Sequence, residues 1–319
     1  MAVRRDGYTL IELIFVVVIM AMLSVASYKG MEALKVRSFK SQQITKLSLE
    51  SQTALNQIAN LLQYRIPYSV IGYDPVSGDF KYIGDVDSDD NMTVLEWVGR
   101  ASESFKKKDY SAFVDMQTKS GDNFLSPNTN GDDISDTIQK KYNISNNIYT
   151  DKIVNLIFAG SFDRALGSSN DIKESFGWHG NDSNDSFDIF IASDGNITLT
   201  DSVKPKFLYE KYFLVDGAYA VARGENIDQS ADCLDSLHVN TKDMNDTLFL
   251  FYDYRPWKGE TFCADPNGNQ KKGKVTILAQ HIVGFRFEEV DYTLRIYLDV
   301  NRSIRASTPV HISKMKVVF

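Results

Sequence analysis

The sequence is poor in cysteine and in histidine, the side chains that most often hold metals. It contains two cysteines and four histidines in 319 residues. Two cysteines cannot build a disulfide scaffold, and Cys233 and Cys263 are too far apart to form a CxxC motif. The histidines are scattered, with no HExxH motif and no pair at helical spacing. The sequence therefore gives no sign of a cysteine-rich fold or of a histidine metal motif.

An excess of positive charge is also missing. The net charge of −7 argues against a nucleic-acid-binding surface over the bulk of the chain, because nothing would neutralise the phosphates. The chain has no G-x-S-x-G elbow, no P-loop and no dinucleotide fingerprint, so we predict no enzymatic activity. Its hydrophobic content of 43%, with 19 Phe and 16 Tyr, is nevertheless enough for a sizeable core.

Proline is absent before Pro67, and the chain begins with a long apolar run. In residues 13–26 the only side chain that is not apolar is Ser24, and Arg4 and Arg5 lie just ahead of the run. The stretch 8–28 is about long enough to cross a bilayer core of ~30 Å. Basic residues ahead of such a span keep the N-terminus in the cytoplasm and send the rest outward. We therefore predict a transmembrane segment over residues 8–28.

Glu12 lies at the head of this apolar run and needs an explanation. The run could be an ordinary secretory signal, cleaved after the small residues Ser24-Val25-Ala26. It could also be a plain single-pass anchor. Neither interpretation explains Glu12, because a carboxylate near the centre of a span costs about 2.5–3.5 kcal/mol, and less near the edge.

A third interpretation accounts for Glu12. The stretch Gly7-Tyr8-Thr9-Leu10-Ile11-Glu12, followed by the apolar run, resembles the N-terminal motif of type IV prepilins and type II secretion pseudopilins. In that family a membrane peptidase removes a short basic leader after its glycine and methylates the new N-terminal residue. The resemblance implies a leader over residues 1–7, cleavage between Gly7 and Tyr8, and N-methylation of Tyr8, which here replaces the usual phenylalanine or methionine.

The same resemblance gives Glu12 a role in subunit registration. In the family, the glutamate at this position pairs with the N-terminal amine of a neighbouring subunit during filament assembly. An amine and a carboxylate brought together in a medium of low dielectric constant offset each other's burial cost, and the pair then sets the register between subunits. The partner of Glu12 would exist only after the chain has been cut.

The helical pattern continues beyond the apolar run. Apolar residues recur at helical spacing up to the first proline, at Met31, Leu34, Val36, Phe39, Ile44, Leu47, Leu55, Ile58, Leu61 and Leu62. We predict one helix over residues 8–66, half transmembrane and half packed on a head domain, ending before Pro67.

Residues 67–319 have the pattern of an antiparallel β-rich head. Residues 68–150 carry few clean strands, whereas later short apolar stretches predict strands at 153–158, 187–191, 197–200, 247–254, 275–279, 283–290, 294–300 and 311–319. Asp216-Gly217 between two strand-like runs predicts a β-hairpin over 212–221. The predicted fold class is α+β, with a long helix on a β-rich head, as in pilins.

The length of the chain bears on its role within that family. Major pilins and pseudopilins are usually about half as long, so the resemblance implies a minor, J-like or W-like subunit of a type IV pilus, a type II secretion pseudopilus or a DNA-uptake filament. Implied partners are the prepilin peptidase, other subunits of a hetero-oligomeric filament and the inner membrane, with secreted cargo or DNA as candidate ligands of the head. The implied location is the inner membrane, with the head in the periplasm or, in a filament, at the cell surface.

An alternative function comes from the signal-peptide interpretation. The chain would then be an exported periplasmic binding protein or enzyme whose first 26 residues are removed, so that the mature chain starts at Ser27. In either case Cys233 and Cys263 would meet an oxidising compartment and could form one bridge. Such a bridge contributes about 3–4 kcal/mol in the chain-entropy model.

An acidic stretch spaces oxygen ligands as a calcium-binding loop does. The candidate ligands are Asp85, Asp87, Asp89, Asn91 and Glu96, and calcium needs six to eight such oxygens. The glycine usual at the sixth position of the loop is missing, and acidic turns recur in this chain. A solvated turn is the favoured interpretation, and calcium is the only cofactor that the sequence suggests.

Sequons for N-glycosylation recur along the chain. Five of them carry aspartate two residues before the asparagine, at Asn91, Asn184, Asn196, Asn245 and Asn301. This extended pattern resembles the acceptor of a bacterial N-glycosylation system, and modification would require exposed loops outside the cytoplasm. The alternative is that aspartate and asparagine simply occur together in turns.

Overall fold

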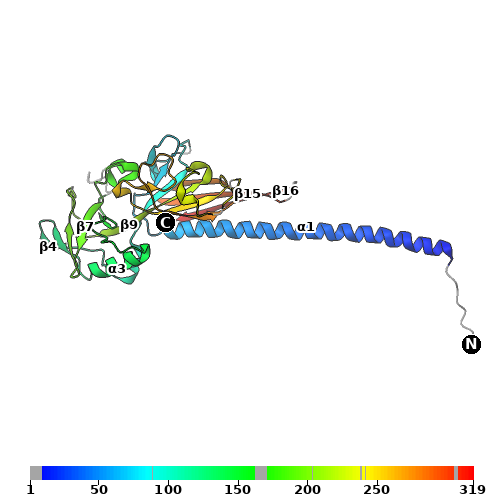
Figure 1. Ribbon diagram of the computed structural model, residues 1–319, viewed down its shortest axis with the longest axis horizontal. Coiled ribbons are helices and arrows are strands. Elements are labelled where there is room, and N and C mark those ends of the chain that lie inside the picture. The colour runs from blue at the N-terminus through cyan, green and yellow to red at the C-terminus, as the bar shows by residue number, and fades with distance from the viewer. Residues whose placement is uncertain are drawn as a thin grey trace, which may run out of the picture.

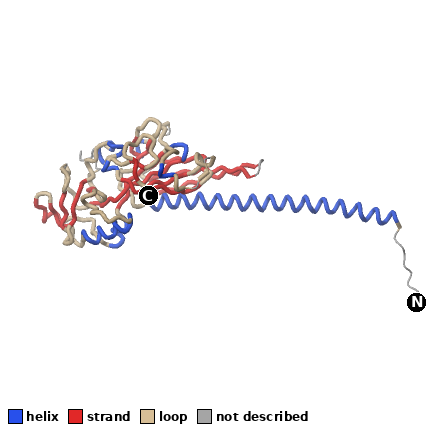
Figure 2. The backbone as a smooth tube through the Cα atoms, in the orientation of Figure 1, coloured by secondary structure: helices blue, strands red, loops and turns tan. Residues whose placement is uncertain are grey.

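A computed structural model shows a long helix that projects from a β-rich head (Figures 1 and 2). It describes residues 9–87, 89–161, 171–202, 204–237, 239–240, 242–304 and 308–319. Helix α1 (Leu10–Leu62) has 53 residues and is therefore about 80 Å long at ~1.5 Å per residue. The predicted α+β class is confirmed.

Only the C-terminal part of α1 packs against the head. Its buried residues recur every three or four positions and so lie on one face: Leu47, Ser51, Ala54, Leu55, Ile58, Ala59 and Leu62. The helix ends four residues before the predicted position because the chain joins a strand: the Ile66 backbone N–H donates to Val98, 3.0 Å away, and Arg65 forms a β-bridge with Gly99.

The main sheet of the head has eleven strands. Nine of them follow the order β2 (Phe80–Tyr82), β1 (Ile71–Tyr73), β3 (Val94–Arg100), β9 (Tyr212–Arg223), β6 (Asn155–Phe158), β7 (Phe187–Ile191), β8 (Asn196–Leu199), β5 (Asn123–Leu125) and β4 (Asp115–Ser120). Strand β10 (Leu248–Tyr254) pairs with β9 and with β13 (Lys274–Ala279). Five of these strands lie in residues 68–150, where the sequence showed few clean strands.

The central strand corrects one prediction. The expected β-hairpin at Asp216-Gly217 does not form, because residues Tyr212–Arg223 are one continuous strand, β9. Asp216 is buried, and its Oδ2 lies 2.5 Å from the Nζ of Lys141, so the acidic side chain has a partner inside the head. The strand is long because its first residues pair with β6 and its later residues pair with β3.

A second sheet holds the helix. Strands β14 (Ile282–Val290), β15 (Thr293–Ile304) and β16 (Thr308–Val318) form an antiparallel sheet whose β15 and β16 run beside α1 (Figure 1). Lys314 on β16 donates to the backbone oxygen of Ser48, 2.7 Å away. Arg302 on β15 donates to Gln43 Oε1 at 3.3 Å. Apolar side chains of this sheet and of α1 share one core, so the helix is an integral part of the head.

Smaller elements complete the described part of the head. The helices are α2 (Ser102–Lys107), α3 (Gly131–Tyr142) and α4 (Ile172–Ser175). Short 3₁₀ segments lie at η1 (Ile83–Asp85), η3 (Trp178–Gly180), η4 (Gly224–Asn226), η5 (Asp232–Leu234) and η6 (Pro256–Lys258). Strands β11 (Thr261–Phe262) and β12 (Lys271–Lys272) form a small parallel pair. α3 contributes Ile134 and Ile138 to a separate hydrophobic core, which also contains buried side chains of β5, β6, β7 and β8.

The packing of α1 predicts unequal effects for two leucines on this helix. Leu55 is fully buried and Leu49 is 63% exposed. We expect Leu55→Ala to lower the free energy of unfolding by about 2–5 kcal/mol, because it removes buried methyl groups and leaves a cavity. Leu49→Ala should change it by less than about 1 kcal/mol. Urea unfolding of the full chain in detergent, followed by tryptophan fluorescence, measures both; equal losses would contradict the packing described here.

Candidate interface of the N-terminal helix

The N-terminal part of α1 exposes its apolar side chains all the way round. Every described residue before position 40 is exposed, including the large apolar residues Leu10, Ile11, Leu13, Ile14, Phe15, Val16, Val17, Val18, Ile19, Met20, Met22, Leu23 and Val25. A helix that is apolar on every side is stable only inside lipid or inside a larger assembly. By length and composition, α1 can cross a membrane.

Charged residues mark where this apolar part ends. Beyond Glu12, the next charged residue is Lys29, which is followed by Glu32, Lys35 and Arg37. Residues 10–28 are helical and extend about 28 Å at ~1.5 Å per residue, close to the ~30 Å thickness of a bilayer core. The helix then continues without a break into the part that packs on the head.

Glu12 occupies the first turn of α1. Its backbone N–H donates to the carbonyl of Thr9, 3.0 Å away, and its side chain is exposed. The unsatisfied N–H groups at a helix N-terminus carry partial positive charge, which favours a carboxylate there. Within the described part of the chain no basic side chain forms an ion pair with Glu12. Gly7 and Tyr8, the predicted cleavage and methylation positions, lie outside the described residues.

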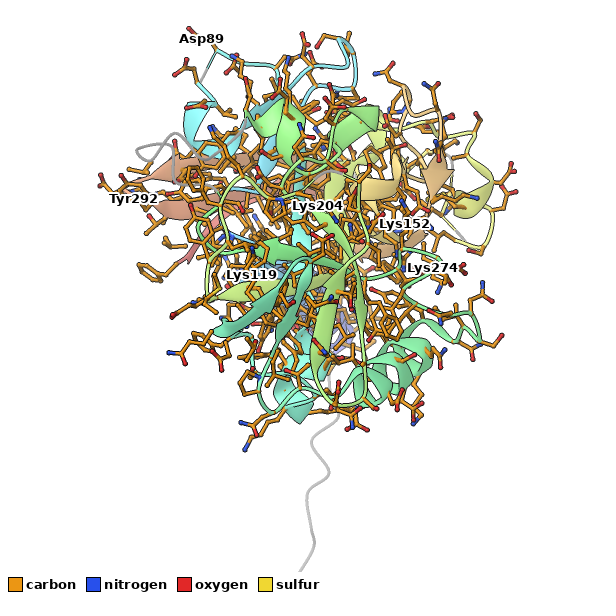
Figure 3. The ribbon with its side chains drawn as sticks, turned by 90° about the vertical axis from the view of Figure 1, so that its left-hand side faces the viewer. Asp89, Lys119, Lys152, Lys204, Lys274 and Tyr292 are labelled. Carbon is orange, nitrogen blue, oxygen red and sulfur yellow. A yellow bond between two sulfur atoms is a disulfide. The ribbon has the colours of Figure 1, made fainter. Side chains whose placement is uncertain are left out.

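The structure separates the members of the predicted calcium loop. Asp89 lies at the outer edge of the head in Figure 3, whereas Glu96 lies inside β3 and is fully buried. In the loop, Asp90 accepts hydrogen bonds from Lys81 Nζ at 2.6 Å and from the backbone N–H of Asp87 at 2.8 Å. Among the described residues, no group of three or more His, Cys, Asp or Glu side chains is placed to hold a metal ion.

Glu96 instead belongs to a buried network that the sequence did not indicate. Its Oε1 lies 2.9 Å from His179 Nε2, and its Oε2 accepts a hydrogen bond of 2.6 Å from the hydroxyl of Tyr254. His179 Nδ1 lies 3.2 Å from Asp265 Oδ2, and the ring stacks on Tyr73 with 3.9 Å between the centroids. These residues are separated by long stretches of sequence, so no local pattern could have revealed the network.

The network changes the proton affinity of His179. Burial alone lowers the pKa of this imidazole, but the neighbouring carboxylates, Glu96 first and Asp265 next, outweigh burial and raise the pKa to about 9. Burial raises the pKa of Asp265, but the hydrogen bond and the charge of His179, together with hydrogen bonds from the backbone of Asn267 and from Tyr73, outweigh burial and lower the pKa. The imidazolium therefore holds two buried carboxylates together at neutral pH.

The predicted bridge between Cys233 and Cys263 is present. The two cysteines form a disulfide with 6.3 Å between their Cα atoms. Cys233 lies in η5, and Cys263 follows β11 directly, two residues before Asp265. The bridge therefore ties the segment that carries Asp265 to a distant part of the chain.

The five candidate glycosylation positions are accessible in different degrees. Asn91, Asn196, Asn245 and Asn301 are exposed, and Asn184 is half-buried. At two of the five, the acidic residue has a structural role: Asp194 Oδ1 accepts from the backbone N–H of Asn196 at 3.0 Å, and Asp299 Oδ1 accepts from Ser313 Oγ at 2.5 Å. These bonds favour the turn and packing explanation at those two positions, and modification stays a prediction.

Comparison with known proteins finds one match. Residues 3–28 match the family model described as the prokaryotic N-terminal methylation motif. The match covers Gly7, Tyr8 and Glu12 as well as the apolar part of α1 up to its first charged residues. No curated protein and no solved structure matches the chain.

The His179 network predicts a pH dependence of stability. Because the pKa is about 9 in the folded chain and near 6.5 when unfolded, the stabilisation is fully present below pH 6.5 and is lost as the pH rises towards 9. We expect the free energy of unfolding to fall by about 3 kcal/mol over this window.

Chemical denaturation of the full chain at a series of pH values measures this effect. His179→Gln should flatten the fall, and His311→Gln, which alters an exposed histidine on β16, should leave it in place. An equally steep fall in both variants would assign the pH dependence to other groups.

Proposed function

We propose, from the premise that this chain belongs to the type IV pilin and pseudopilin family, that it is a minor subunit that initiates or caps a filament. The methylation motif over residues 3–28 is the observation that carries the proposal. It coincides with the part of α1 whose apolar side chains have no partner in the described structure. The family is structural, and the proposed role assigns no chemical step to the chain itself.

The proposed pathway starts in the inner membrane. Arg4 and Arg5 would hold residues 1–7 in the cytoplasm as a leader, and residues 67–319 would face the periplasm. The prepilin peptidase would then cut between Gly7 and Tyr8 and methylate the amine of Tyr8. The disulfide between Cys233 and Cys263 supports this orientation, because such bonds persist in oxidising compartments.

Assembly would exchange lipid contacts for subunit contacts. The exposed apolar part of α1 would leave the bilayer and pack against the equivalent helices of other subunits. Glu12 would meet the new N-terminal amine of a neighbouring subunit, and each charge would offset the burial cost of the other. Because Glu12 lies in the first turn of α1, this contact would form at the level of the neighbour's N-terminus and would set the axial register.

The size of the head supports a place at the end of a filament. The described residues beyond α1 contribute to three hydrophobic cores, and strands β15 and β16 lie beside α1. A filament interior must accommodate heads on all sides of each subunit, whereas a filament end leaves one side open. Cargo or DNA would meet the head at this open end. The partner subunits decide whether the filament is a type IV pilus, a type II secretion pseudopilus or a DNA-uptake filament.

The alternative is an exported binding protein or enzyme that starts at Ser27. Helix α1 continues without interruption through that position into the buried face that begins at Leu47. Cleavage there would leave an exposed helical stub with Met31, Leu34 and Phe39 in water. This arrangement favours retention of the whole helix and therefore the filament role.

Processing of the N-terminus provides the first test. We expect the mature chain, purified from bacterial membranes, to begin with N-methylated Tyr8, because the peptidase cuts after Gly7. Mass spectrometry of the intact chain and of its N-terminal peptide measures this directly. A mature chain that starts at Ser27 would exclude the filament proposal and support the exported-protein alternative.

Glu12 provides the second test. Glu12→Gln keeps the shape of the side chain and removes its charge, so we expect incorporation into filaments to fall by more than about tenfold while membrane insertion continues. Glu32→Gln is the matched control, because Glu32 is exposed on the same helix beyond the apolar part. Quantitative immunoblotting of sheared filaments and of membranes measures both variants. Normal incorporation of Glu12→Gln would remove the registration role from Glu12.

A further inference from the structure

Two tyrosines on the surface of the head occupy turn positions that glycine normally fills. Pro67 and Tyr68 are the central residues of a turn that is closed by a hydrogen bond of 3.2 Å from the Ser69 backbone N–H to the carbonyl of Ile66. Tyr68 has a φ of +63°. A turn with proline at its first central position and a positive φ at its second is a type II turn, whose second position favours glycine or asparagine.

Tyr292 repeats this arrangement in a second turn. Asp291 and Tyr292 connect β14 to β15, where Val290 pairs with Thr293. Their φ angles are +51° and +60°, which makes the connection a type I′ turn. Such turns favour Asn-Gly or Asp-Gly, so Tyr292 stands where glycine is expected. A bulky residue with a positive φ is strained, and folded proteins keep such strain mainly at functional sites.

Both tyrosines border one small pocket. Its volume is about 180 Å³, and Tyr68, Tyr82 and Tyr292 are among the residues that line it. Small-molecule cavities usually have ~300–1,000 Å³, so this pocket suits one inserted side chain better than a whole ligand. Of the described phenylalanine, tyrosine and tryptophan residues, only Tyr68 and Tyr292 have a positive φ. Two such outliers at one pocket indicate that the pocket has a function.

The charged groups of the pocket are held by the protein itself. Arg65 Nη1 donates to the backbone oxygens of Leu62 and Phe319, at 2.9 and 3.3 Å. Glu289 accepts a hydrogen bond of 3.0 Å from the hydroxyl of Tyr82. Because the two charges are opposite in sign and both have hydrogen-bond partners, the pocket suits an apolar side chain better than an ion.

The pocket lies on the side of the head. Figure 3 looks along α1 from the far end of the head, and Tyr292 lies at the edge of the head in this view. Tyr292 is 83% exposed and Tyr68 is 43% exposed, so both rings are accessible to a partner. In the proposed filament, parallel α1 helices place the heads side by side, and a surface that faces sideways meets a neighbouring head.

We propose that Tyr68 and Tyr292 form an interface with the head of a neighbouring filament subunit, which inserts an apolar side chain into the pocket between them. This inference rests on the proposed filament function. Tyrosine is enriched at protein interfaces, where a buried aromatic ring contributes ~150–250 Å² of contact surface. That contact would offset the strain of the two turns. Glycine in these turns would relax the strain and remove the contact, so stability and assembly would change in opposite directions.

Tyr292→Gly is the decisive variant. We expect the thermal midpoint of the full chain in detergent to stay unchanged or to rise by up to about 4 °C, because glycine suits a type I′ turn. Its incorporation into sheared filaments, measured against the amount in the membrane, should fall by about tenfold, the loss typical of a tyrosine at the centre of an interface. Tyr292→Phe keeps the ring and should be incorporated normally.

Two further variants separate the interface from the turn. Tyr68→Asn, with a residue that tolerates a positive φ, should lower incorporation in the same way. Lys108→Gly is the matched control, because Lys108 is exposed and has a φ of +66° at the end of α2 but does not line the pocket. It should leave incorporation unchanged.

A photo-crosslinker identifies the occupant. p-Benzoylphenylalanine is introduced at position 292 or, as a control, at position 108 of the full chain, and intact filaments are irradiated. Mass spectrometry then identifies the cross-linked peptides. We expect cross-links from position 292 to the head of a protein that carries its own N-terminal methylation motif, and none to that protein from position 108.

Three results would overturn the inference and leave the filament role standing. The first is incorporation of Tyr292→Gly at the wild-type level. The second is an equal loss in Lys108→Gly, which would assign the effect to turn relaxation in general. The third is cross-linking from position 292 to a secreted protein in place of a filament subunit. Absence of the wild-type chain from filaments would remove the filament role and this inference together.

Discussion

Helix α1 has two parts, and the rest of the structure depends on the difference between them. Its C-terminal part packs on the head, whereas its N-terminal part packs on none of the described residues. Leu47, Leu55 and Ile58 attach the helix to the β14–β16 sheet, and Lys314 and Arg302 strengthen that attachment with hydrogen bonds to the helix. The head therefore covers only the C-terminal part of the helix. The N-terminal part must lie in lipid or against other helices, and a chain with two such environments is suited to move from one to the other.

The interior of the head contains ion pairs and a disulfide that link distant segments. Part of its rigidity comes from charged groups in its interior: Lys141 with Asp216, and His179 with Glu96 and Asp265. Each pair joins segments that lie far apart in the sequence, and breaking a buried pair by removing one partner is strongly destabilising. The disulfide between Cys233 and Cys263 adds a covalent link beside the same network. These links join segments of the head that are distant in the sequence.

The sequence pattern located strands correctly where the burial of each residue depends on its neighbours in the sequence. The strands predicted at 187–191, 247–254 and 275–279 correspond closely to β7, β10 and β13, because short apolar stretches between polar turns are typical of strands with a buried face. The predicted hairpin at Asp216-Gly217 was wrong because a contact from a distant segment decides the structure there. An Asp-Gly pair favours a turn, but here Lys141 on α3 neutralises Asp216 and the strand passes straight through. Glu96 was misplaced in a surface loop because its partners, His179 and Tyr254, are distant in the sequence.

By itself the sequence determined the N-terminal motif, the long helix, the β-rich class of the head and the pairing of its two cysteines. These follow from short-range spacing, from the hydrophobic period and, for the cysteines, from there being only one possible pair. Tertiary structure alone decided where Asp216 and Glu96 find their partners, Lys141 for the first and His179 and Tyr254 for the second. The physical reason is that buried polar networks are formed by groups from distant segments, which leave no periodic pattern along the chain.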